Sequence, residues 1–147
     1  MGEIFYLKDH FSVGKIYINQ GSKNNLEKKL IKTEEVDIAS ENMTKKIGNF
    51  YLTEINTEFK DENTSSSVYY LSNNNITMLL MGDATVETED YLLLNYDLKV
   101  DIIKLGHHGS STSSSERFLS KLKPKLALIS VCLLYTSPSP RDGATSR

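Results

Sequence analysis

The second half of the chain alternates between two hydrophobic periods. A period of two predicts strands over residues 49–56, 67–72, 76–82, 100–105 and 125–131. A period near 3.6 predicts helices over residues 85–96 and 115–123. The run from Met78 to Met81 is continuously apolar, as expected of a central strand covered on both faces. This order of strands and helices predicts parallel strands whose carboxyl ends share one edge of a sheet.

The first half of the chain has a weaker pattern. Apolar residues in 2–11 have the spacing of a short amphipathic helix, and residues 15–19 alternate like a strand. Residues 24–32 predict a second, polar helix, whereas 33–46 is compatible with short strand or loop. The predicted fold class is therefore α/β, or mixed α+β, with a mixed sheet whose antiparallel part precedes Asp83.

Length and charge limit the classes of protein to consider. The chain has 147 residues, enough for one domain with a modest core. Its formal net charge of −2 gives no broad attraction to nucleic acid, so a polyanion has to be held by a local site or a metal ion. We find no apolar run long enough to cross a bilayer, and the first residues lack the layout of a signal peptide.

Composition changes sharply at residue 132. The segment 132–147, CLLYTSPSPRDGATSR, holds two arginines, two prolines and the only cysteine, Cys132, but no lysine. A single cysteine excludes an intramolecular disulfide. We interpret this segment as a translated sequencing-library adapter, and we expect it to have no fold and no role.

Two strand ends carry residues that can bind a metal. Asp83 follows the apolar strand through Gly82, and His107 leaves the next predicted strand 24 residues later. A right-handed crossover would bring Asp83 and His107 to the same sheet edge, where a carboxylate and an imidazole are suitable ligands for zinc, manganese or iron. Alternatively, the Gly-Asp pair only forms a turn or a helix cap. If the segment is extended, His107 and His108 point in different directions, so at most one of them faces the metal.

The serine-rich loop after the histidines has two possible interpretations. Its serines can cap the following helix, and Ser113 and Glu116 have the spacing of a capping box. Alternatively, hydroxyls of Ser110, Ser111 or Thr112 contact a substrate phosphate.

The combination of these features resembles one family. ITMLLMGDATVETEDYLL and VDIIKLGHHGSSTSSSERFLSKLKPKLALISV are similar to the metallo-β-lactamase-fold hydrolase domain of ComEC-type DNA-internalisation competence proteins and their stand-alone relatives. In that family one strand ends in Gly-Asp and the next in HHGS, followed by a serine-rich loop, a helix and a KPxxAxxS strand. The resemblance covers about residues 1–131 and is strongest over 76–131.

This resemblance implies a fold and an activity. The fold is an αββα sandwich with helices on the outer faces and two divalent metal ions, zinc or manganese, at one edge. Asp83 would bridge the ions and His107 would complete one of them, with His108 as the alternative ligand. The metals would activate water for attack on a phosphodiester. DNA is the implied substrate during competence uptake, and the bacterial parent protein is membrane-attached, as a competence channel, or secreted.

The chain also departs from the family pattern. The family's metal motif, HxHxDH or HxDxDH, lies just before a segment that looks like residues 1–19, and a later HP or HPH segment has no counterpart here. We therefore expect residues 1–131 to be a partial domain that is inactive and essentially metal-free, with apolar sheet surface exposed. Two other functions stay open, a stand-alone hydrolase of another phosphodiester such as a phosphorylcholine ester, and a non-catalytic binding module. The sequence leaves the oligomeric state open.

Overall fold

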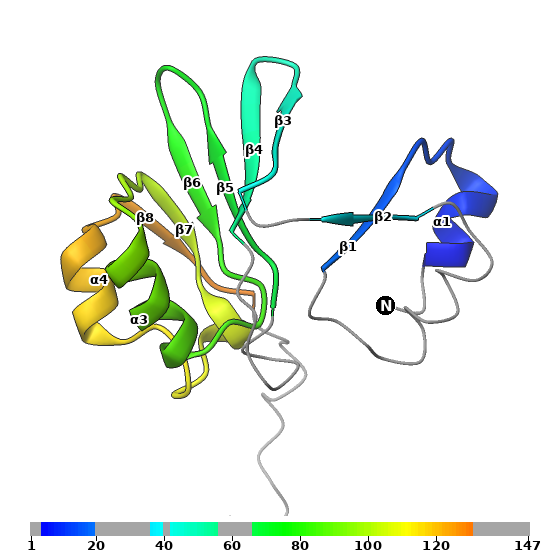
Figure 1. Ribbon diagram of the computed structural model, residues 1–147. Helices are drawn as coiled ribbons and strands as arrows, with labels where there is room; N and C mark the ends of the chain where they lie inside the picture. The colour runs from blue at the N-terminus through cyan, green and yellow to red at the C-terminus, as the bar shows by residue number, and fades with distance from the viewer. Residues whose placement is uncertain (1–3, 20–35, 40–41, 56–65, 131–147) are drawn as a thin grey trace, which may run out of the picture.

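The computed structural model describes residues 4–19, 36–39, 42–55 and 66–130, and it has the α/β content predicted from the sequence. Its main element is a six-stranded sheet in the order β3-β4-β5-β6-β7-β8, and β1 and β2 form a separate parallel pair (Figure 1). The strands are β1 Ile16–Asn19, β2 Val36–Ala39, β3 Thr44–Ile47, β4 Phe50–Ile55, β5 Val68–Ser72, β6 Thr77–Leu80, β7 Ile102–Lys104 and β8 Leu126–Leu128. The helices are α1 Ile4–His10, α3 Val86–Asn95 and α4 Glu116–Leu122, with a short 3-10 helix, η1, over Gly106–Gly109.

Strand direction changes in the middle of the main sheet. β3, β4, β5 and β6 are antiparallel neighbours, whereas β6, β7 and β8 are parallel. The parallel strands are connected by α3 and α4, so their carboxyl ends lie at one edge, as the sequence predicted. None of the helices in the described ranges is long and apolar enough to span a membrane.

The two crossover helices cover one face of the main sheet (Figure 1). The register places Tyr70, Leu79 and Ile103 in one row across β5, β6 and β7, and the last two are fully buried. Phe118 of α4 is 1% exposed and packs into the same core. The buried core cluster consists of Ile55, Val68, Leu79, Met81, Ala84, Leu92, Val100, Ile103, Leu105 and Phe118.

The opposite face of the sheet is also apolar. Side chains alternate between the faces of a strand, so the adjacent row lies on this second face, and it consists of Leu52, Leu71, Met78, Ile102 and Leu126. Tyr17 of β1 lies over its β3 end, where the Lys45 ammonium is 4.3 Å from the ring centroid. At the β8 end, Leu126 and Leu128 are 50% and 41% exposed. Apolar sheet surface is therefore exposed, as expected, while the complete αββα sandwich stays a prediction.

One buried carboxylate ties together the amino ends of the parallel strands. Asp101, directly before β7, accepts hydrogen bonds from the backbone nitrogen and hydroxyl of Thr77 at 3.0 and 2.9 Å. Its other oxygen forms an ion pair with the Lys125 ammonium at 2.8 Å. The hydrogen bond from Lys125 and those from Thr77 lower the pKa of Asp101 to about 2. Three strands are thus held in register by one side chain.

Most of the predicted elements in the described ranges are confirmed. The ambiguous segment 33–46 contains β2 and most of β3, and the loop predicted after β7 begins with η1. The helix predicted over 24–32 and the segment 132–147 lie outside the described residues.

Candidate functional site

Three segments meet at the carboxyl edge of the parallel strands. Asp83 follows β6, His107 and His108 follow β7, and Ser130 follows β8. Because the β6–β7 and β7–β8 pairs are parallel, all three residues or pairs lie at the same edge of the sheet. Asp83 and His107 therefore leave the sheet at the same edge, as the sequence predicted.

The turn that carries Asp83 depends on glycine. Gly82 has a φ of +57°, and a Cβ at this position would lie 2.5 Å from the Ser66 hydroxyl oxygen. That hydroxyl accepts a hydrogen bond from the Asp83 backbone nitrogen at 2.9 Å, and the Gly82 carbonyl accepts one from the His107 nitrogen at 3.0 Å. The backbone is thus fixed on both sides, while the Asp83 side chain is 58% exposed.

The histidine turn is tight, not extended. His107 and His108 both have positive φ, 43° and 55°, within η1. Gly106 is buried, and a Cβ there would lie 2.6 Å from the Ala84 carbonyl oxygen, so only glycine lets the two turns pack together. The sequence-based expectation that the two rings diverge assumed an extended segment, and that assumption is wrong.

His108 is the histidine that faces Asp83. Its Nδ1 lies 2.9 Å from the Ser130 carbonyl oxygen, and its Nε2 lies 3.9 Å from Asp83 Oδ1. A carbonyl oxygen only accepts hydrogen bonds, so Nδ1 carries the proton, and in the neutral ring Nε2 presents its lone pair to the carboxylate. Two electron-pair donors that face each other in this way can share a proton or a metal ion. The geometry therefore favours the alternative ligand, His108, over His107 as the neighbour of Asp83.

His107 is held by the serine-rich loop. Its Nδ1 is 3.1 Å from the Thr112 hydroxyl, which is itself 3.1 Å from the Ser110 hydroxyl. These two hydroxyls orient an imidazole, a role that the sequence did not suggest. Ser111 is exposed on the same loop.

Glu89 of α3 was missed by the sequence analysis, although it organises this loop. Its carboxylate is 1% exposed and accepts hydrogen bonds from the backbone nitrogens of Ser114 and Ser115, the latter at 2.9 Å. A signal was available, because Glu89 lies three positions before buried Leu92 and so shares the apolar face of its helix.

The predicted capping box of Ser113 and Glu116 is wrong. Ser115 is the N-cap of α4, and its hydroxyl accepts a hydrogen bond from the Phe118 nitrogen at 3.3 Å. The Ser113 hydroxyl instead donates to the Gly106 carbonyl at 2.8 Å, which ties the loop to the histidine turn.

The donor set at this edge fits part of a metal site. A metal-bound histidine usually donates its second ring N–H to a carbonyl or carboxylate, and the contact between His108 and Ser130 has this form. The 3.9 Å between His108 Nε2 and Asp83 Oδ1 is less than the sum of a zinc–nitrogen and a zinc–oxygen bond, about 2.0–2.2 Å each. Within residues 4–19, 36–39, 42–55 and 66–130, no three His, Cys, Asp or Glu side chains come together to hold a metal ion.

Comparison with known proteins connects the chain to bacterial competence. No family model matches the chain. It is 31% identical over 140 residues to ComE operon protein 3 of Bacillus subtilis. This alignment covers 88% of this chain and 18% of that protein. It is 38% identical over 69 residues to Recombination protein 2 of Haemophilus influenzae, and this alignment covers 47% of this chain and 9% of that protein. It is 36% identical over 89 residues to Competence protein ComA of Neisseria gonorrhoeae, and this alignment covers 59% of this chain and 13% of that protein.

These similarities show a relative of competence proteins and support a bacterial origin. The chain spans less than a fifth of the length of each of the three proteins. The resemblance to competence proteins found in the sequence is confirmed at this level, while the metallo-β-lactamase fold stays a prediction.

Proposed function

We propose that this chain supplies part of a metal-dependent phosphodiesterase site that acts on DNA during uptake by competent bacteria. The observation that supports the proposal is the pairing of Asp83 Oδ1 with His108 Nε2, 3.9 Å apart, at the carboxyl edge of a parallel sheet. The similarity to competence proteins supplies the biological context.

The chain's own residues position the ligands in this proposal. The Ser130 carbonyl fixes the tautomer and ring orientation of His108, and the Ser66 hydroxyl fixes the backbone of Asp83. His107 lies on the same turn, where its Nδ1 contacts the Thr112 hydroxyl, and it does not join the pair of Asp83 and His108. A bound zinc or manganese ion would supply Lewis-acid stabilisation of the charge that develops on a phosphodiester.

Hydroxyls of the adjacent loop are the proposed substrate contacts. Ser110, Ser111 and Thr112 follow the histidine turn directly and lie on the same side of the sheet. The Thr112 hydroxyl would donate a hydrogen bond to a phosphate oxygen only if it gave up its contact with His107.

Metal affinity should be weak, because a catalytic zinc site uses about three protein ligands and the described residues bring only Asp83 and His108 face to face. We expect dialysed protein to hold less than one ion per chain and to bind added Mn²⁺ weakly and reversibly. Calorimetric titration of Asp83→Asn and His108→Gln should show lost binding. His10→Gln is the matched control, since this exposed histidine lies on α1 and contacts the Tyr6 carbonyl. Equal Mn²⁺ affinity in all variants would refute the ligand assignment.

The DNA role is best tested in the context of a longer relative. The segment of Bacillus subtilis ComE operon protein 3 that aligns over 140 residues would be replaced by the corresponding residues of this chain. We expect the chimera to support transformation and to release nucleotides from labelled DNA. Both activities should be lost in Asp83→Asn and His108→Gln and kept in His10→Gln.

The same chimera separates the alternatives. Hydrolysis of a phosphorylcholine ester without DNA degradation would favour the small-substrate enzyme. Transformation that persists without DNA degradation and is insensitive to Asp83→Asn would favour a non-catalytic module.

A further inference from the structure

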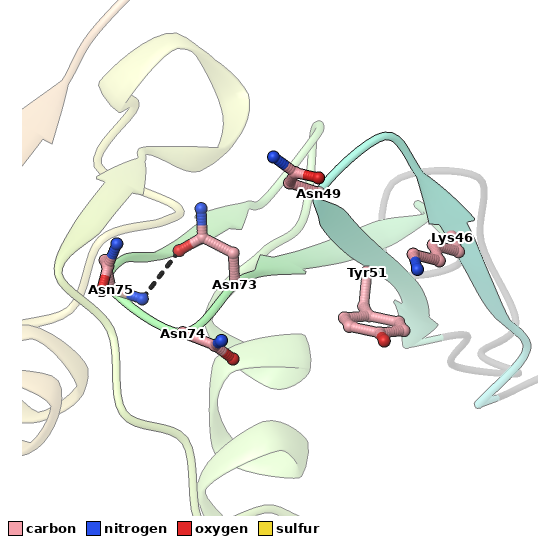
Figure 2. A pocket seen from close by; sticks show the side chains of 6 residues that line it. All are labelled: Lys46, Asn49, Tyr51, Asn73, Asn74 and Asn75. Carbon is pink, nitrogen blue, oxygen red and sulfur yellow. Dashed lines mark hydrogen bonds between the residues drawn. The ribbon is translucent and has the colours of Figure 1, made fainter.

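A polar pocket lies between the turn of the β3–β4 hairpin and the turn of the β5–β6 hairpin. Its volume is about 340 Å³, and Figure 2 shows its lining side chains, which are Lys46, Asn49, Tyr51, Asn73, Asn74 and Asn75. The turn of residues 73–76 precedes β6, whereas Asp83 follows it, so the pocket lies at the opposite end of the sheet from the candidate metal ligands (Figure 1). It is therefore a separate site.

The lining side chains form a chemically complementary set. Lys46 and Tyr51 are direct partners in the β3–β4 pair, so their side chains share one face of the sheet. The Tyr51 side chain is 47% exposed, and the Lys46 ammonium lies 6.0 Å from its ring centroid. None of the lining residues carries a carboxylate. The pocket thus offers a half-exposed aromatic ring with a single positive charge over it.

The asparagines add hydrogen-bonding groups, and one of them, Asn73, has a fixed orientation. Asn73 Oδ1 accepts hydrogen bonds from the backbone nitrogens of Asn75 and Ile76, both at 2.9 Å. The carbonyl end of this side chain is thereby committed to the turn, and its amide N–H groups stay available as donors. Asn74 and Asn75 place two more amides along the same turn.

This set matches the chemistry of an unpaired nucleotide. An aromatic face stacks on a base of any sequence, an ammonium binds the phosphate, and amides bond to base edges or sugar. The volume lies within the range of about 300–1,000 Å³ typical of small-ligand pockets. A duplex would not expose a base face for stacking, and the absence of a carboxylate among the lining residues avoids repulsion of the phosphate.

We propose that this hairpin pocket binds single-stranded nucleic acid, with a base stacked on Tyr51 and its phosphate held by Lys46. The contact is independent of hydrolysis at Asp83 and His108. With a net charge of −2 the chain attracts a strand only weakly at long range, so affinity depends on the local stacking contact.

The test is fluorescence anisotropy of the full 147-residue chain with a labelled oligothymidylate of about 12 nucleotides. Tyr51→Thr keeps a residue that favours strands and removes the ring, and it should weaken binding about 5- to 150-fold. Tyr51→Phe should bind as the unaltered chain does. Lys46→Gln should reduce the slope of log affinity against log salt concentration by about 0.7.

Matched controls lie outside the pocket. Tyr6→Ala removes another exposed tyrosine, 60% exposed on α1, and Lys121→Gln removes an exposed lysine of α4, and neither should change affinity. Failure of the chain to bind the oligonucleotide, or equal binding by Tyr51→Thr, would overturn the proposal, as would tighter binding of duplex. Loss of binding in Asp83→Asn would also overturn it, by placing the strand at the other edge. A chain that binds the strand at Tyr51 but whose chimera degrades no DNA would refute the proposed hydrolase alone.

Discussion

Replacing Glu89 with glutamine should destabilise the chain by about 2–4 kcal/mol. The Glu89 carboxylate is 1% exposed and accepts two backbone hydrogen bonds, from Ser114 and Ser115. A buried donor left without an acceptor costs about 1–3 kcal/mol, and more where the lost acceptor is charged. Glutamine keeps one acceptor oxygen but turns an N–H group toward the second backbone N–H, so one charged bond is lost and one donor is left unpaired. The domain's whole stability is on the order of 5–15 kcal/mol, so this loss is a large fraction of it.

Urea unfolding followed by circular dichroism measures this change, with Glu87→Gln as the matched control. Glu87 is in the first turn of the same helix but is exposed, so its substitution should change stability by less than about 0.5 kcal/mol. Hydrogen exchange should also accelerate in the loop that Glu89 supports, where the Thr112 carbonyl accepts a hydrogen bond from the Val86 nitrogen at 3.0 Å. Equal unfolding free energies for the two variants would refute the assigned role of Glu89.

Two further substitutions probe both ends of the parallel strands. Gly106→Ala places a Cβ 2.6 Å from the Ala84 backbone oxygen and should lower the free energy of unfolding, measured by thermal unfolding, by about 1–3 kcal/mol. Gly14→Ala is the control, because no atom lies within 4 Å of its added Cβ, and it should not lower the free energy. Equal effects of the two substitutions would contradict the close packing of the turns. The pKa of Asp101 is lowered from 3.8 to about 2, so its contribution to stability is fully present above pH 3.8 and is lost as the pH falls toward 2. Asp101→Asn should remove this part of the acid dependence of the urea midpoint, and an unchanged acid profile would show that the pairing with Lys125 does not set it.

The parallel direction of the last three strands and the common sheet edge of Asp83 and His107 could be predicted because they follow from local pattern and one topological rule. Hydrophobic period two and 3.6 locate the elements, and a right-handed crossover brings consecutive strand ends to one edge. Gly82 and Gly106 also stand in the sequence as the residues that make close turns possible. These signals lie within a few residues of the feature they predict.

The contacts that were missed depend on residues far apart in the chain. Glu89 meets Ser114 and Ser115 across a separation of 25 and 26 residues, so no local motif identifies these partners, although the position of Glu89 on the apolar face of α3 indicates its burial. In a run of serines several positions satisfy a capping spacing, and the long-range carboxylate contact accompanies the choice of Ser115 over Ser113. The error had a physical cause, the degeneracy of a polar run.

The choice between the two histidines illustrates the same limit at the candidate site. Sequence spacing favoured His107, because it leaves the strand first. The positive φ values of both histidines rotate the turn, so His108 Nε2 is 3.9 Å from Asp83 and His107 Nδ1 contacts Thr112. The Ser130 carbonyl then selects the His108 tautomer that points a lone pair at the carboxylate. In the proposed site a metal ion would be bound by this same lone pair, so the contact of Nδ1 with Ser130 favours His108 as the ligand.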